Sequence, residues 1–427
     1  MHLKQPLRKD DDMKKLIALL LVFAMALGMT ACSQVSANDL MKDVPAKAVD
    51  VLPDMDAGAA AAADFGVRLF KTSIEEGENT LISPLSVLYA LAMTANGADG
   101  ETLAQMEQVL GMDVDNLNSY MLAYLNLLPE SKDYKMSLAN SIWFKDDPNF
   151  AVEQSFLQTN ADYYGAGAYK AAFDEGTRND INNWVKEHTD GMIPEIIDEI
   201  PDEAIMYLVN ALAFDAKWAD EYEEHQIREG RFTMEDGTRQ DVDMMHSEEY
   251  TYLEDDLATG FIKYYKDRRY AFVAMLPNEG VTVSQYVDSL TGEHLRDLVN
   301  NPQDVTVFAS IPKFETEYDI EMSEVLQEMG ITDAFDWRVA DFSRLGTYNV
   351  DGMNICINRV LHKTCISVTE QGTRAGAATA VEMVAEGAAE IIEYKEVVLD
   401  RPFVYMLIDC ETNLPFFIGS MMNVNGD

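Results

Sequence analysis

In the stretch Val368–Val381, VTEQGTRAGAATAV, small side chains follow an acidic residue and Gly-Thr. In an extended strand, alternate residues point to opposite faces. One face would then carry Thr373, Ala375, Ala377, Thr379 and Val381. The other face would carry Arg374, Gly376, Ala378, Ala380 and Glu382, and with them both charges. Because one face is free of charge, it can be buried without leaving an ion unpaired. We therefore predict that this stretch is a loop that inserts into a sheet.

The composition is that of a large acidic protein. Hydrophobic residues make up 48% of the 427 residues, which is enough for a sizeable core. The 74 acidic and 32 basic residues give a net charge of -42. A field of this sign repels nucleic acid, anionic membrane surfaces and heparin-like polyanions, so we expect none of these as partners. It attracts basic proteins, although high solubility is the simpler interpretation of the charge.

The N-terminal residues have the pattern of an export signal. Lys14 and Lys15 precede an apolar run, Leu16–Met29, that is shorter than the roughly 20 residues of a membrane-spanning helix. The run ends at Met-Thr-Ala-Cys32, which resembles a bacterial lipobox, in which the cysteine is lipidated and becomes the first mature residue. We predict a signal peptide over residues 1–31 and lipidation at Cys32. The protein is then extracellular, either secreted or anchored at the cell surface as a lipoprotein.

The rest of the chain is predicted to form one domain. Residues 32–57 contain Ser, Asn, Asp, Ala and two prolines, which is typical of a flexible tether. Residues 58–427 show no internal repeat and no second linker, and we assign them to a single domain. If Cys32 is lipidated, the remaining cysteines are an odd number without metal-ligand spacing: Cys356, Cys365 and Cys410. We therefore expect neither disulfides nor a metal to hold the fold.

The hydrophobic pattern predicts helices first and strands later. Apolar residues recur at helical spacing over Ala59–Phe70 and Pro84–Asn96. Apolar or alternating runs with β-branched and aromatic residues predict strands over Ser137–Phe144, Ala204–Phe214, Tyr270–Leu276, Val305–Ile311, Cys365–Val368 and Phe403–Ile408. The fold class is therefore α+β, with a sizeable and mostly antiparallel sheet.

Separate blocks of the chain, in the order of the family, resemble the serpins. They are Asn79-Thr-Leu-Ile-Ser-Pro-Leu-Ser86, Ala90-Leu-Ala-Met, Gly97-Ala-Asp-Gly-Glu-Thr, Leu208-Val-Asn-Ala-Leu-Ala-Phe with Trp218, Ile311-Pro-Lys-Phe, Ala340-Asp-Phe-Ser, His362-Lys and Asp400-Arg-Pro-Phe. The resemblance runs from about Ala59 to Val424. It implies the serpin fold, with three β-sheets, about eight or nine helices and an exposed reactive-centre loop that contains the opening stretch.

The resemblance also implies roles for residues around the main sheet. In serpins, a polar cluster lies under the place where this sheet opens, and the matching residues are Ser83, Ser86, Asn210 and His362. A lone histidine is usually a structural residue, and here that structural role is itself functional. We interpret this cluster as a shutter and not as a catalytic group.

The resemblance implies a second group of residues at the end of the sheet where the inserting strand first enters. There the positions matching Glu370 and Lys313 approach each other near Trp218. A surface ion pair contributes about 0 to 1 kcal/mol, so this pair is either a modest stabiliser or a lock on the opening, and both interpretations stay open. The loop hinge consists of Glu370, Gly372, Thr373, Arg374, Ala375, Gly376, Ala377, Ala378 and Thr379.

The implied activity is suicide inhibition of serine proteases. The protease attacks the loop as a substrate and forms an acyl-enzyme, and insertion of the cleaved loop traps it before water can release it. Family spacing, counted from Glu370, places the attacked carbonyl at Glu386, before Gly387, which would favour a protease that accepts acidic residues. The small neighbours Val384, Ala388 and Ala389 instead favour an elastase-like protease and a shift of the bond to Ala385. Both positions stay open. The surrounding glutamates favour a cationic protease.

Other functional classes have less support in the sequence. The motifs of serine hydrolases, zinc proteases and phosphate-binding loops are absent, and none of the six histidines has ligand spacing. We therefore expect a protein that is not an enzyme, has no cofactor and is a monomer. The alternative is a serpin-fold protein without inhibitory activity, namely a surface binding protein or a chaperone. The unbroken run of small residues in the hinge favours inhibition.

Overall fold

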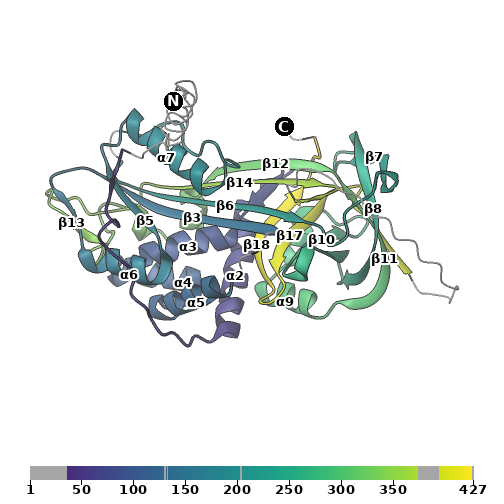
Figure 1. The fold of residues 1–427 in the computed structure, drawn as a ribbon, viewed down its shortest axis with the longest axis horizontal. Coiled ribbons are helices and arrows are strands. Elements are labelled where there is room, and N and C mark those ends of the chain that lie inside the picture. The colour runs from purple at the N-terminus through teal and green to yellow at the C-terminus, as the bar shows by residue number, and fades with distance from the viewer. Residues whose placement is uncertain (1–35, 129–130, 132, 202–203, 374–393, 426–427) are drawn as a thin grey trace, which may run out of the picture. The chain divides into compact units, whose positions relative to one another are not determined.

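The first of two large sheets has seven strands, several of which run side by side across Figure 1. The computed structural model describes residues 36–128, 131, 133–201, 204–373 and 394–425. The strand order is β1 (Asn38–Asp39), β5 (Gly167–Ala171), β3 (Tyr134–Lys145), β6 (Met206–Lys217), β15 (Gly372–Thr373), β14 (Arg359–Thr369) and β12 (Phe314–Glu321). The pairs β3–β5 and β6–β14 are parallel, and the other pairs of this sheet are antiparallel.

The second large sheet has nine strands. Its order is β16 (Tyr394–Val398), β11 (Gln303–Pro312), β8 (Arg239–Glu254), β9 (Ala258–Tyr264), β10 (Tyr270–Pro277), β17 (Phe403–Asp409), β18 (Leu414–Met421) and β2 (Thr80–Ile82), with β7 (Ile227–Thr233) paired to β8. All its pairs are antiparallel except β11–β16. A third sheet joins β4 (Phe150–Val152) to β13 (Gly346–Tyr348).

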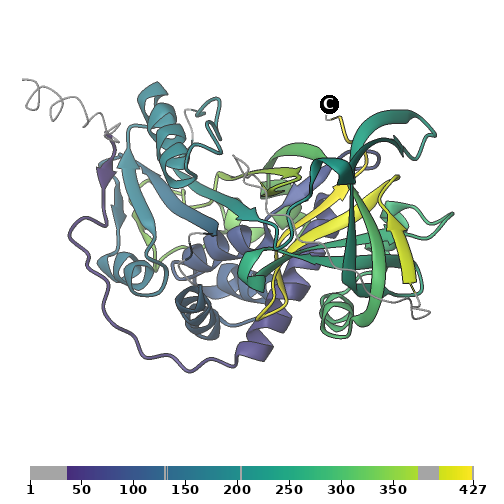
Figure 2. The same cartoon turned by 45° about the vertical axis from the view of Figure 1, so that its right-hand side comes forward.

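The described part of the chain contains nine α-helices. They are α2 (Met55–Ser73), α3 (Pro84–Ala95), α4 (Gly100–Leu110), α5 (Val114–Leu127), α6 (Gln154–Tyr164), α7 (Glu175–His188), α8 (Val283–Ser289), α9 (Gly292–Asn300) and α10 (Ser323–Met329). Figure 1 shows α3, α4 and α5 on one side of the seven-stranded sheet and α7 on the other. Figure 2 shows the same arrangement after a 45° turn.

Helix α3 connects the two large sheets, because it packs against β3 and β6 of one and β18 of the other. Ser83 caps its N-terminus by accepting a hydrogen bond from the backbone N–H of Ser86 at 3.3 Å, and Pro84 occupies its first turn. Every residue of α3 is buried, as expected of a helix that is apolar on all sides. The position of Ser83 and Ser86 is therefore set by a helix that packs on all sides.

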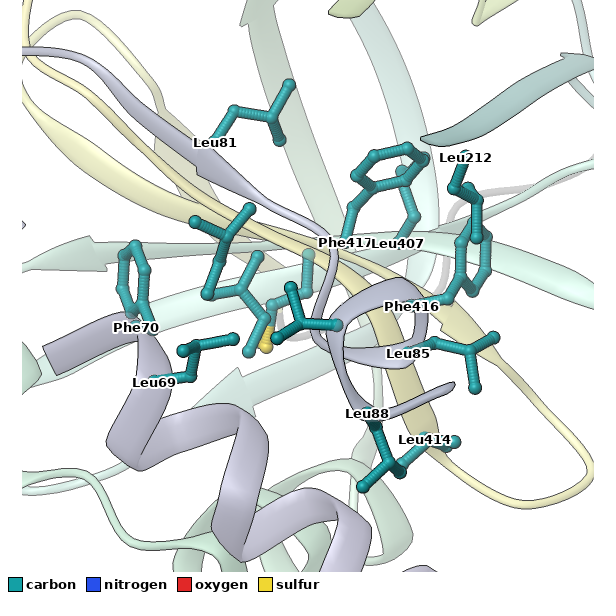
Figure 3. Close-up of a cluster of buried hydrophobic side chains, with 14 of the residues drawn as sticks. Leu69, Phe70, Leu81, Leu85, Leu88, Leu212, Leu407, Leu414, Phe416 and Phe417 are labelled. Atoms are coloured by element: carbon teal, nitrogen blue, oxygen red, sulfur yellow. The ribbon is translucent and has the colours of Figure 1, made fainter. Parts of the chain in front are cut away.

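The core fills the space between helices α2 and α3 and the strands of the nine-stranded sheet (Figure 3). Leu69 and Phe70 come from α2, and Leu85 and Leu88 come from α3. Figure 3 shows these side chains with Leu407, Leu414, Phe416 and Phe417 of β17 and β18. Burial of this apolar surface holds the two sheets and the helices in one unit, residues 37–427.

The fold class and the elements predicted from the hydrophobic pattern are confirmed. Ala59–Phe70 lies within α2, and Pro84–Asn96 coincides with α3. The six predicted strands fall within or overlap β3, β6, β10, β11, β14 and β17. None of the cysteines in the described residues, Cys356, Cys365 and Cys410, forms a disulfide.

The structure differs from the prediction of a flexible tether up to residue 57. Asn38 and Asp39 pair with β5 at the edge of the seven-stranded sheet, and Val44 is buried. The backbone N–H of Lys47 donates to the Asp162 carboxylate at 2.7 Å. The compact unit therefore begins at Ala37. The composition did not predict this because the partners of the segment are distant in sequence.

The predicted signal peptide, residues 1–31, and the predicted lipidation site Cys32 lie outside the described residues. Within the described residues, no helix has both the length and the apolar character needed to cross a membrane.

Candidate functional site

Strands β6 and β14 are paired along only part of their length. Arg359–Lys363 of β14 pair in parallel with Tyr207–Ala211 of β6. Beyond these pairs, no ladder joins Leu212–Asp215 to Thr364–Ser367, all of which the structure describes. Both segments remain paired on their outer sides, to β3 and β12 respectively. Within the described residues, β6 and β14 therefore share no ladder over this interval, which is the kind of position that a further strand can occupy.

A short strand, β15, already lies at the end of this interval. Thr373 pairs with Val368 of β14 and with Ala216 of β6. Thr373 is 1% exposed, and its Oγ1 lies 2.5 Å from the hydroxyl oxygen of Tyr265. The structure thus buries the first residue of the face that the sequence predicts to point inward.

Gly372 precedes Thr373 and has a backbone conformation that other residues rarely adopt, with φ of 152°. A Cβ atom at this position would lie 2.0 Å from the carbonyl oxygen of Ala216 on β6. Gly372 therefore permits the close approach of the loop to β6 at the point where β15 begins.

Trp218 holds the chain that leads into β15. It is completely buried and stacks on Tyr265, with the ring centroids 4.5 Å apart. Its indole N–H donates to the Thr369 carbonyl at 2.8 Å, and its backbone N–H donates to the Gln371 carbonyl at 3.1 Å. These contacts position the residues on both sides of Glu370.

Glu370 and Lys313 form an ion pair, with Nζ 2.9 Å from the Glu370 carboxylate. The hydrogen bond from Lys313 holds the pKa of Glu370 below its usual range. Both side chains are about one-third exposed, at 33% for Glu370 and 28% for Lys313, so the pair is partly screened by solvent. The Glu370 carbonyl also accepts the backbone N–H of Tyr222 at 2.9 Å.

A buried ion pair that the sequence analysis missed lies next to the ring of Trp218. The Nζ of Lys263 is 2.8 Å from the Glu249 carboxylate, and the two side chains are 3% and 13% exposed. The same ammonium lies 4.5 Å from the Tyr222 ring centroid and 5.4 Å from that of Trp218. A lysine within the apolar run Phe261-Ile262-Lys263 was the available signal, because charged residues in such strands are rarely buried unless paired.

The four polar residues assigned to the shutter lie together and are completely buried. The Nε2 atom of His362 accepts the backbone N–H of Ser83 at 3.0 Å, so the ring proton is on Nδ1. Nδ1 lies 2.7 Å from Asn210 Oδ1, which also accepts the Ser86 hydroxyl at 3.0 Å. Asn210 donates in turn to the carbonyl of Leu361 at 3.1 Å.

This polar cluster joins α3 to β6 and β14, just before the interval in which these two strands are no longer paired. His362 and Asn210 are directly paired residues of β14 and β6, one position before the last parallel pair. Burial lowers the pKa of His362 to about 3, so the ring is neutral at ordinary pH. The cluster therefore depends on an uncharged imidazole.

The remaining predicted site residues are not placed by the structure. Cys32, the hinge residues Arg374, Ala375, Gly376, Ala377, Ala378 and Thr379, and the reactive-bond residues Ala385, Glu386 and Gly387 lie outside the described ranges. Within those ranges, no three His, Cys, Asp or Glu side chains are arranged to hold a metal ion.

Known proteins with similar structures share this architecture. The native-state structure of tengpin, a thermophilic serpin, is 48% identical, with a TM-score of 0.87 over 91% of this chain and 99% of that one. The latent-state structure of tengpin matches with a TM-score of 0.76 at 47% identity, over 89% of this chain and all of that one. The present structure is thus more similar to the native state than to the latent state.

Sequence comparisons give the same result. A protein of Thermococcus kodakarensis, named as an uncharacterized serpin-like protein, is 30% identical over 90% of this chain and 91% of its own length. Human serpin B9 is 29% identical over 86% of this chain and 99% of its own length. The sequence model of the family described as "Serpin (serine protease inhibitor)" matches residues 60–424. The chain therefore belongs to the serpin family of serine protease inhibitors.

Proposed function

We propose that this protein inhibits serine proteases by a suicide-substrate mechanism. The observation that carries the proposal is the position of β15 between β6 and β14, at the start of an interval where these two strands have no ladder between them. Residues that follow Thr373 would extend β15 along this interval. Each added residue would gain backbone hydrogen bonds on both sides.

The residue pattern supports such an extension. Thr373 is buried, and the strand period then directs Ala375, Ala377, Thr379 and Val381 to the same face. All four are small or apolar, so they would enter the sheet without an unpaired charge. Arg374 would point to the opposite face, where its guanidinium stays in solvent.

The chemistry is that of an interrupted proteolysis. The protease serine attacks the carbonyl carbon of Ala385 or Glu386, and its proton passes through the protease general base to the departing amine. The peptide C–N bond breaks, an ester to the protease forms, and the C-terminal fragment gains a free amino group while β16, β17 and β18 keep it in the nine-stranded sheet. Insertion of the cleaved loop then displaces the protease before a water molecule can hydrolyse the ester.

The partner and the location complete the proposal. Small residues on both sides of the reactive bond favour an elastase-like protease, and the net charge of -42 favours a cationic one. The signal-peptide pattern supports a location outside the cell or, if Cys32 is lipidated, at its surface.

The experiment is incubation of residues 33–427 with elastase-like, chymotrypsin-like and glutamate-specific serine proteases. We expect a band of inhibitor plus protease that survives a denaturing gel. The mass of the C-terminal fragment, which separates only on denaturation, then distinguishes cleavage after Ala385 from cleavage after Glu386. Clean cleavage by every protease, without such a band, would contradict inhibition and favour the binding or chaperone alternative.

The fold alone does not distinguish protease inhibition from the binding or chaperone alternative. The structure of human thyroxine-binding globulin in complex with thyroxine matches this chain at 23% identity with a TM-score of 0.77. The proposal of inhibition therefore depends on β15 and on the hinge sequence, and not on the fold.

A further inference from the structure

An exposed patch on the nine-stranded sheet combines aromatic and acidic side chains. Its members come from three adjacent strands, and we call it the acidic aromatic patch: Glu248, Tyr250, Phe308, Tyr394 and Glu396. The exposed fractions of its aromatic residues are 59% for Tyr250, 46% for Phe308 and 64% for Tyr394. Both glutamates are also exposed.

The strand register places these side chains on one face. Phe308 of β11 lies opposite Glu248 of β8 on one side and opposite Glu396 of β16 on the other. The rings of Phe308 and Tyr394 meet edge to face, with centroids 5.3 Å apart. Tyr250 donates a hydrogen bond to the Glu248 carboxylate at 3.2 Å. Directly opposed residues of a ladder share a face, so aromatic and acidic groups are interleaved across the three strands.

The lysine within β16 pairs with a glutamate outside the patch. Lys395 lies between Tyr394 and Glu396 in sequence and therefore points to the opposite face. Its Nζ is 5.1 Å from the ring centroid of Tyr252 and 4.0 Å from the Glu254 carboxylate. Partial burial, followed by the charge of Glu248, raises the pKa of Tyr250, which is consistent with a negative potential at this surface.

The patch adjoins the segment that carries the predicted reactive bond. Tyr394 begins the edge strand β16, which lies beside β11 (Figure 1). The chain from Glu386 to Tyr394 has a length of at most about 30 Å, at about 3.5 Å per residue. A protease domain of ordinary size has a radius of gyration of roughly 17 Å, so one bound at the reactive bond can also contact the patch.

We propose that the acidic aromatic patch is a second contact surface for the attacked protease, and that it binds an arginine-rich or lysine-rich region beside the active site of that protease. This inference rests on the proposed inhibitory function and adds a determinant of partner choice to it. A guanidinium can stack on Phe308 or Tyr394 while pairing with Glu396 or Glu248, so the patch fits arginine in particular.

A second copy of this chain is a poorer occupant. Edge strands such as β16 can pair with another sheet edge. Two patches of the same sign would repel each other, however, and each chain carries a net charge of -42. Charge complementarity therefore selects a basic protease as the partner.

Binding of a protease whose catalytic serine is replaced by alanine tests the patch without acylation. Two variants of residues 33–427 are needed: Glu248→Gln with Glu396→Gln, and Phe308→Ser with Tyr394→Ser. For a basic elastase-like protease, we expect each variant to raise Kd about 5- to 20-fold at low salt. In the glutamine variant this difference should shrink to about twofold at high salt, because screening removes the charge effect.

Matched controls separate the patch from net charge and from general surface changes. Glu324→Gln with Glu328→Gln on α10 removes the same charge from exposed positions elsewhere. Trp337→Ser removes an aromatic ring with a similar exposed fraction, 47%. Both controls should bind the basic protease within about twofold of the parent protein, which is the usual range for surface changes away from an interface. An acidic protease of the same specificity should not distinguish the patch variants from the parent.

The outcomes distinguish this inference from the proposed function. Patch variants that bind the basic protease as tightly as the parent would overturn the inference, even if the parent traps active proteases. Weakened binding without any trapped complex would support the patch and contradict the inhibitory mechanism. Concentration-dependent dimers of the parent that the patch variants lose, seen by sedimentation velocity, would make the patch a self-association surface and would also overturn the inference.

Discussion

Thr373 is buried between β6 and β14, and its Oγ1 lies 2.5 Å from the hydroxyl oxygen of Tyr265. Tyr265 stacks in turn on Trp218, whose indole N–H binds the carbonyl of Thr369. The chain is therefore held on both sides of the turn that joins β14 to β15, and the next residues are those whose insertion the proposed mechanism requires.

Replacing Thr373 with arginine should convert the inhibitor into a substrate. A guanidinium at a position that is 1% exposed would be buried beside Tyr265 without a counter-ion, so the hinge could not enter the sheet. We expect proteolytic cleavage to continue while the gel-stable complex disappears. The control is Thr373→Ser, which keeps the hydroxyl and should keep the complex. A stable complex from Thr373→Arg would show that this position does not have to enter the sheet.

The Gly372→Ala variant tests the close approach of the loop to β6. Its Cβ would meet the Ala216 carbonyl oxygen at 2.0 Å, in addition to the strain of a positive φ. We expect a loss of stability on the order of 1 to 3 kcal/mol, and a larger number of inhibitor molecules consumed per protease trapped. Gly77→Ala is the matched control, because φ at Gly77 is 83° but a Cβ there meets no atom within 4 Å. Equal changes in the thermal midpoint of the two variants would argue against a role for the contact with β6.

Removal of the Lys263 ammonium should destabilise the protein strongly. Lys263→Met leaves the Glu249 carboxylate in a site where it is 13% exposed, and it also removes the cation from the faces of Tyr222 and Trp218. We expect a loss of about 3 kcal/mol, measured by urea unfolding. The double variant with Glu249→Gln should recover part of this loss, because no unpaired charge remains. A double variant no more stable than Lys263→Met would contradict this explanation.

Stability should fall on acidification because of His362. Burial depresses its pKa from 6.5 to about 3 in the folded protein, so the folded state favours the neutral ring. This contribution to stability is complete above about pH 6.5 and is lost as the pH falls toward 3. The loss is on the order of 2 kcal/mol by about pH 5. Thermal midpoints between about pH 5 and 7 measure it.

The acid dependence has an internal control. His362→Gln should be less stable near neutral pH and should show a smaller fall on acidification, since the titrating group is gone. His225→Gln, at a side chain that is 73% exposed, is the control for replacing a histidine at the surface. If His362→Gln retained the full acid sensitivity of the parent protein, another group would have to be responsible.

Much of the fold could be predicted because local patterns determine it. The apolar spacing of Pro84–Asn96 and the β-rich runs at β10 and β17 predict their elements directly, since these segments are buried along their length. The edge pairing of Asn38 and Asp39 could not be found in this way, because it depends on β5, which is distant in sequence.

The same distinction applies to the candidate site, where local sequence predicts some residues and not others. Alternation in the hinge predicts an inward-facing Thr373, and the structure buries it. The four residues of the polar cluster are scattered over the chain, and only the family resemblance grouped them before the structure did. The pair Lys263–Glu249 joins β9 to β8 through side chains, so the local sequence does not indicate which residue pairs with the lysine.

The central claim is that the cleaved loop inserts between β6 and β14, and hydrogen–deuterium exchange of the intact and the loop-cleaved protein tests it most directly. Cleavage within the loop by a protease that is not trapped supplies the second sample. The account predicts that amides of Leu212–Asp215 and Thr364–Ser367 on the inner sides of the two strands become strongly protected after cleavage, because a new strand binds them. Unchanged exchange in both segments after complete cleavage would contradict insertion, and with it the proposed mechanism.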